Sequence, residues 1–186
     1  MSSLDTKDYQ EASEELCVAT PKVKAVADIE SRGSGFFDNG EPKILYEAHI
    51  FSDETEGQFD ESHPNISSPY WDRSLYEGGK AEHDRLQKAV ELDREAALKS
   101  ASWGKFQILG RNFSVCGYDS LQDFINAMYR SEKGHLEAFT GFIQNQGLDE
   151  PLREEDWESF AAAYNGSDFR KNAYHIKLKE AYEKFS

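Results

Sequence analysis

The hydrophobic residues of this chain recur mostly every three or four positions, the spacing that gathers them on one face of an α-helix. Residues that can cap a helix precede several of these segments, and glycines follow several of them. Helices are predicted over residues 5–16, 21–32, 80–99, 121–131, 135–145, 156–165 and 170–184. The pattern therefore indicates a mainly helical protein.

Residues 42–51 depart from that spacing, because this segment is short and rich in residues that favour strands. From Ile44 to Asp72 the chain has seven acidic residues, two prolines and no Lys or Arg. Residues 52–70 are accordingly predicted to form a long irregular surface loop, and loops of this length are often functional. We expect residues 1–186 to form one mainly α (α+β) domain with a small β excursion near residues 40–75.

Glu30 occupies an unusual place for a carboxylate, the last turn of the helix predicted over residues 21–32. Thr20 can cap this helix, Pro21 fits its first turn, and Gly33 follows its end. A carboxylate at the negative end of a helix dipole is disfavoured and holds its proton more tightly. Such a group suits a general acid, although a single glutamate in a last turn is more often an ordinary solvated side chain.

The net charge of −14 argues against nucleic acid and anionic membrane surfaces as partners, because both are bound through patches of Lys and Arg. No apolar run is long enough to cross a bilayer, and the N-terminus lacks a secretory signal pattern. The protein is therefore expected to be made in the cytoplasm and not to insert into a membrane. Cys17 and Cys116 have neither disulfide nor zinc spacing, and both are expected to be buried apolar groups.

Several classes of chemistry lack the residues they need. The five histidines are scattered without a metal-binding motif, neither cysteine has a histidine placed to activate it, and there is no phosphate-binding loop, so no metal or cofactor is expected. Carboxylate chemistry on a sugar remains, which needs an acid with a raised pKa and usually a second carboxylate or a positioned water. Side chains at breaks between the predicted helices could project into a sugar-binding cleft, although each alone is more often a core residue: Trp103, Phe106, Gln107, Tyr164 and Asn165.

Three ordered motifs resemble the lysozyme-like superfamily of goose-type lysozymes and soluble lytic transglycosylases. They are Glu30-Ser31-x-Gly33, Ser102-Trp103-Gly104-x-Phe106-Gln107-Ile108 and Ala163-Tyr164-Asn165-Gly166. With the segments at 42–49, 81–86 and 100–110, the chain is similar over roughly residues 8–185 to the N-acetylmuramidase domain family found in endolysins of phages that infect Gram-negative bacteria.

The resemblance implies that Glu30 is the catalytic acid and that the substrate is peptidoglycan, cleaved at the β-1,4 bond between N-acetylmuramic acid and N-acetylglucosamine. The residues expected to bind this substrate are Ser102, Trp103, Gln107, Tyr164 and Asn165, with Trp103 also supporting the turn that presents Gln107. The second carboxylate stays open between Glu47 and Glu82 as the group that orients water. Glu47 could equally form a buried structural pair with an Arg or His.

Several functions fit these residues. The first is a hydrolytic muramidase acting as an endolysin. A lytic transglycosylase would need only Glu30, and a secretion-system effector would use the same chemistry after another route of delivery. A non-catalytic wall-binding module would keep the aromatic residues without needing Glu30. We expect a monomer without a separate wall-binding module, which reaches periplasmic peptidoglycan from the host cytoplasm through a pore made by a holin-like protein, because the negative charge disfavours passage through an anionic outer membrane.

Overall fold

The computed structural model describes residues 3–31, 33–166 and 169–186. The helices are α1 (Thr6–Leu16), α2 (Thr20–Glu30), α3 (Ala48–Glu54), α4 (Ala81–Leu92), α5 (Arg94–Lys99), α6 (Leu121–Arg130), α7 (Glu132–Asn145), α8 (Asp149–Glu154), α9 (Trp157–Asn165) and α10 (Tyr174–Phe185). The strands are β1 (Ile44–Tyr46), β2 (Ala101–Trp103) and β3 (Ile108–Leu109), and short 3-10 turns cover η1 (Arg73–Leu75) and η2 (Gly110–Asn112). The predicted fold class, mainly helical with a small β portion, is confirmed.

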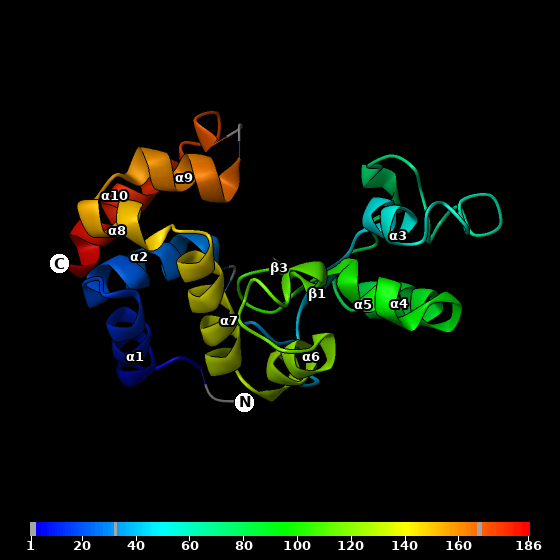
Figure 1. The fold of residues 1–186 in the computed structure, drawn as a ribbon, viewed down its shortest axis with the longest axis horizontal. Helices are drawn as coiled ribbons and strands as arrows, with labels where there is room; N and C mark the ends of the chain where they lie inside the picture. Colours follow the sequence, from blue (N-terminus) through cyan, green and yellow to red (C-terminus); the bar gives the residue numbers. More distant parts are fainter. Residues whose placement is uncertain (1–2, 32, 167–168) are drawn as a thin grey trace.

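The helices form two lobes joined by the small sheet (Figure 1). Helices α1, α2, α8, α9 and α10 make up the larger lobe, in which α2 packs against both α1 and α10. Helices α3, α4 and α5 form the smaller lobe on the other side of the sheet. Helix α7 stands between them and is buried over most of its length, with Leu136, Ala138, Phe139 and Ile143 all in the interior.

The sheet is antiparallel in the order β1-β2-β3, and its two faces differ in character. Successive side chains of a strand point to opposite faces, so a register position fixes a side chain's face. Leu45 pairs with Ser102, which pairs in turn with Leu109, and all three are half-buried on one face. The opposite face carries buried side chains, among them Tyr46 and Trp103, and packs on the core. The half-buried face is therefore free to form the floor of a site.

The segment predicted as a strand over residues 42–51 is a strand only at Ile44–Tyr46 and becomes helix α3 from Ala48. Ala48 and Phe51 are three residues apart and both buried, a helical spacing that the strand-favouring residue types concealed. The predicted irregular loop after it is held in place at Asp60, whose carboxylate accepts hydrogen bonds from Ser52 and Ser67.

Other helix ends also differ from the sequence prediction. The helix expected over residues 80–99 divides at Asp93, which ends α4 and caps α5 through a 2.9 Å bond from the Ala96 amide. Helix α7 begins at Glu132 rather than 135, α10 begins at Tyr174 rather than 170, and α8 was not predicted. Such ends depend on capping contacts, which hydrophobic spacing does not report.

Two residues near the start of the chain have other roles than expected. The cap of α2 is Ala19, while the Thr20 hydroxyl bonds to that of Ser13 at 2.9 Å. Cys17 is exposed at the end of α1, where it adopts a left-handed conformation, whereas Cys116 is buried as predicted. The last residue of the second predicted helix, Arg32, lies outside the described residues.

Candidate active site

A cavity of about 670 Å³ lies between the larger lobe and the sheet. The larger lobe contributes Glu30 from the end of α2 and Tyr164 from the end of α9. The sheet contributes its half-buried face, with Leu45, Ser102 and Leu109. The lining combines apolar and aromatic groups with polar side chains, among them Lys43, Gln107 and Asn112. A concave site of this kind is typical of a binding pocket for a small ligand or a segment of a polymer.

Glu30 is the carboxylate that lines this cavity. It is half-buried, and the side-chain amide of Asn165 donates to both of its oxygens, at 3.0 Å to Oε1 and 3.2 Å to Oε2. Burial raises the pKa of Glu30, and the hydrogen bonds from Asn165 oppose this rise because they favour the ionised form. The direction matches the prediction from the helix end, but the main cause is burial, which only the folded chain supplies.

Tyr164 closes the cavity beside Glu30. Its ring packs on the rings of Phe139, Phe142 and Phe160, with centroids 5.7–6.0 Å apart. Burial raises the pKa of Tyr164, and the neighbouring charge of Glu30 adds to the effect. Tyr164 therefore keeps its hydroxyl proton and belongs to an aromatic cluster in the cavity wall.

The loop that follows Glu30 is tied to the turn before Gln107 by residues that the sequence analysis did not single out. Glu132 accepts a 2.7 Å bond from the Gly35 amide, and His135 accepts one of 3.1 Å from the Lys105 amide. The His135 ring lies between two glycines, because a Cβ at either Gly35 or Gly104 would come within 2.5–2.8 Å of it. These contacts hold the loop after Glu30 against the turn that carries Gly104 and Lys105, two residues that line the cavity. In the sequence, the only local sign of these contacts was the presence of glycine at positions 35 and 104.

Gln107 and Trp103 are presented differently from the way the sequence suggested. Gln107 lines the cavity with a φ of 50°, and its side-chain amide donates to the Gly104 and Lys43 carbonyls at 2.8 and 3.4 Å. Its donors therefore already have backbone partners. Trp103 is 1% exposed on the core face, where its indole donates to the Leu98 carbonyl at 3.1 Å. It supports the turn, but the structure does not place it where a sugar could contact it.

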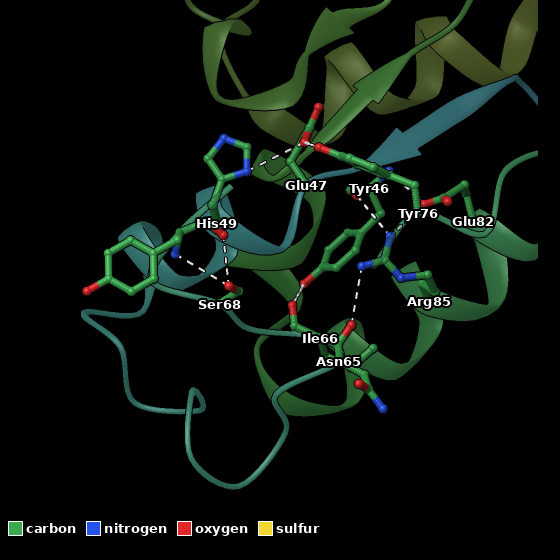
Figure 2. A network of polar contacts seen from close by, with 10 residues as sticks. Tyr46, Glu47, His49, Asn65, Ile66, Ser68, Tyr76, Glu82 and Arg85 are labelled. Atoms are coloured by element: carbon green, nitrogen blue, oxygen red, sulfur yellow. Dashed lines mark hydrogen bonds and ion pairs between the residues drawn. The ribbon is translucent and has the colours of Figure 1, made fainter. Parts of the chain in front are cut away.

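Glu82 lies in the interior and outside the cavity (Figure 2). Its Oε2 accepts from the Tyr46 amide and from Arg85, at 3.2 and 2.9 Å. Its Oε1 accepts 2.8 Å bonds from the amides of Glu77 and Gly78. With 0% exposure and both oxygens engaged, Glu82 is not placed to orient a water at the cavity, which corrects its candidacy as the second carboxylate.

Glu47 is placed differently, at the end of β1 and two residues beyond Leu45 (Figure 2). That spacing puts it on the same side of the strand as Leu45, which lines the cavity. Its side chain is 16% exposed, and its Oε2 accepts a hydrogen bond from the Tyr76 hydroxyl. His49 Nδ1 lies 3.6 Å from the same oxygen. The geometry is thus compatible with both roles considered for Glu47, a partner of water and a partner of His49.

Two absences hold for residues 3–31, 33–166 and 169–186. There, no three His, Cys, Asp or Glu side chains gather closely enough to hold a metal ion. None of the helices in these ranges has the length and hydropathy that a bilayer crossing requires.

A carboxyl group with a raised pKa, in a cavity between a helical lobe and a small antiparallel sheet, is typical of the lysozyme-like class of glycoside hydrolases. The family model of N-acetylmuramidase matches residues 19–186, so the chain belongs to the N-acetylmuramidase (Muramidase) family. The chain is also similar to the crystal structure of a Burkholderia AP3 phage endolysin, with a TM-score of 0.92 and 34% identity. That likeness covers 98% of this chain and 71% of the endolysin chain. No match is found among curated proteins.

Family and structural likeness together confirm the resemblance inferred from the motifs. The chain is a peptidoglycan hydrolase, a glycoside hydrolase with lysozyme-type activity.

Proposed function

We propose that Glu30 is the general acid of this hydrolase and protonates the glycosidic oxygen between N-acetylmuramic acid and N-acetylglucosamine. The observation that supports the assignment is the half-buried Glu30 carboxyl in the cavity wall, whose pKa is raised by burial. A general acid must keep its proton near the working pH and release it as the C–O bond breaks. The two hydrogen bonds from Asn165 then stabilise the carboxylate that is left behind.

The second half of the reaction consumes the sugar cation formed when the bond breaks. In hydrolysis, a water attacks the anomeric carbon and a carboxylate takes its proton. We infer that Glu47 is this carboxylate, because it follows β1 directly, two residues beyond the cavity-lining Leu45, and has no bond to Oε1 among the described residues. In a lytic transglycosylase, Glu30 would instead accept the proton of the sugar's own hydroxyl, and Glu47 would not be needed.

The products and a Glu47→Gln variant together separate these reactions. If water is the nucleophile, mass spectrometry of digested peptidoglycan should show reducing ends, which are heavier by one water than 1,6-anhydro ends. The Glu47→Gln change should then slow hydrolysis by about 10²-fold, because a base no longer takes the proton of water. Glu54→Gln is the matched control, a carboxylate 21% exposed at the other end of α3. Anhydro ends, with full activity in Glu47→Gln, would assign transglycosylation.

The pH dependence of kcat/KM should change when the hydrogen bond from Asn165 to Glu30 is removed. Because that bond favours the ionised form, Asn165→Ala should raise the pKa of Glu30 further, so the acid form persists to higher pH. The alkaline limb of kcat/KM is expected to move to higher pH, since the hydrogen bond that holds the pKa of Glu30 down is lost. Asn145→Ala is the control, because Asn145 also ends a helix but its side-chain amide donates to the Val115 carbonyl instead of to Glu30. An unmoved or lowered limb would contradict the assignment of Glu30.

We also propose that the enzyme reaches the wall from the cytoplasmic side, as expected from its charge of −14. Purified protein added outside intact Gram-negative cells should then fail to lyse them, whereas cells with permeabilised membranes should lyse. Lysis of intact cells at the same rate would overturn this route.

A further inference from the structure

Tyr70 and Trp71 are two neighbouring aromatic residues that the fold leaves in solvent, with 78% and 62% of their surfaces exposed. They lie in the segment between α3 and α4, just before η1. A single exposed apolar side chain needs no explanation, but two adjacent large aromatic rings are typical of a binding surface. We propose that Tyr70 and Trp71 form a platform on which the peptidoglycan glycan strand stacks beyond the bond that is cleaved.

The backbone that carries the platform is held by local hydrogen bonds. The Ser68 hydroxyl donates to the Tyr70 carbonyl at 2.8 Å, and the Ser68 amide donates to the Ala48 carbonyl at 3.2 Å. On the other side, the Asp72 carboxylate accepts from the amide and hydroxyl of Ser74 at 2.8 and 2.7 Å. The two rings are therefore presented on a fixed loop, so that binding to them has a low cost in conformational entropy.

Two contacts and two short stretches of chain lead from the platform to the cavity around Glu30. The Trp71 ring lies 6.4 Å from the ring of Tyr76, whose hydroxyl donates to Glu47. Glu47 in turn lies two residues beyond Leu45, which lines the cavity. Gly79, three residues after Tyr76, lines it as well. A polymer that crosses the cavity can thus continue along Tyr76 to Trp71. This step rests on the proposed function of the cavity.

The chemistry of the surroundings favours a sugar chain over an anionic surface. The faces of pyranose rings carry C–H groups that pack on aromatic rings, while their hydroxyl groups stay in water. The chain from Ile44 to Asp72 has seven acidic residues and no Lys or Arg, which would repel anionic lipid headgroups. A neutral sugar backbone is not repelled in this way. The glycan strand also extends on both sides of the cleaved bond, so it can reach a second site.

The test measures binding of the full chain carrying Glu30→Gln, so that the wall is not digested. Trp71→Ala and Tyr70→Ala are made in this background, and co-sedimentation with purified Gram-negative peptidoglycan is compared with binding to phosphatidylglycerol vesicles. Ile176→Ala is the matched control, because Ile176 is also apolar and 50% exposed but lies on α10. Trp71→Ala is expected to weaken binding to peptidoglycan about tenfold, as loss of an aromatic anchor does, and Ile176→Ala to leave it unchanged.

A second measurement uses Trp71→Ala with Glu30 intact. Its KM for polymeric peptidoglycan should rise while its kcat stays near that of the unchanged chain, and its turnover of short soluble glycan fragments should be unaffected. Equal binding of Trp71→Ala and Ile176→Ala to peptidoglycan would overturn the platform, and so would a loss confined to vesicles. Digestion of the wall by the Glu30→Gln chain would refute the proposed role of Glu30 alone. The platform is tested separately, by the difference in binding between Trp71→Ala and Ile176→Ala.

Discussion

Replacing Glu30 by Gln is expected to slow the digestion of peptidoglycan by about 10²–10⁴-fold, the usual contribution of a general acid. Glutamine keeps the size of the side chain and can still accept a bond from Asn165, but it has no proton to give to the glycosidic oxygen. The rate is measured as the fall in turbidity of purified peptidoglycan. Asp28→Asn is the control, since Asp28 lies two residues earlier on α2 with 49% of its side chain exposed, near Lys184. Comparable rates for the Gln variant and the unchanged chain would refute the assignment.

Glu30→Gln should gain stability although it loses activity, and the gain in stability should grow as the pH rises. Burial raises the pKa of Glu30 above its value in the unfolded chain. The stability contributed by its proton is therefore fully present below the unfolded pKa and lost as pH rises through the folded pKa. Glu30→Gln should melt at a higher temperature than the unchanged chain at about pH 8, and the difference should shrink towards about pH 4. Thermal unfolding at both pH values checks this.

The second large effect is expected for Glu82→Ala, which should lower the free energy of unfolding by about 3–5 kcal/mol. The change leaves the Arg85 guanidinium, 2% exposed, without its carboxylate in the interior. It also removes the acceptor of three backbone amides, those of Tyr46, Glu77 and Gly78. Urea titration measures the loss.

Asp84→Ala on the same helix is the matched control for Glu82→Ala. Asp84 is exposed, so its replacement should change the free energy of unfolding by no more than about 0.5 kcal/mol. A Glu82→Ala chain that stays as stable as the control but loses activity would show that the buried pair is not structural. It would also return Glu82 to candidacy as the second carboxylate.

Much of the architecture followed from local patterns in the sequence. Helix α6 has buried Phe124, Ile125 and Met128 at helical spacing and follows Ser120, whose hydroxyl caps it by accepting from the Asp123 amide at 3.1 Å. Both features could be predicted, because spacing and capping involve residues close together in the chain. The same holds for the placement of Glu30 in the last turn of α2. Residues 42–51 were predicted less well, since a short apolar segment fits a strand and a helix alike.

Tertiary structure alone decided which side chains meet at the site. Glu30 and Asn165 are 135 residues apart in sequence, and only folding brings an amide onto both carboxylate oxygens and buries them. Sheet register turned Trp103 to the core and Ser102 to the cavity.

Folding likewise separated two carboxylates that looked equivalent in sequence, because it buries Glu82 in the interior with Arg85 and leaves Glu47 partly exposed beside Tyr76 and His49. The sequence by itself determined the helical class and the place of Glu30 at a helix end, because those depend on neighbours along the chain. Burial, register and long-range hydrogen bonds depend on neighbours in space, and they decided the pKa of Glu30 and the partners around it.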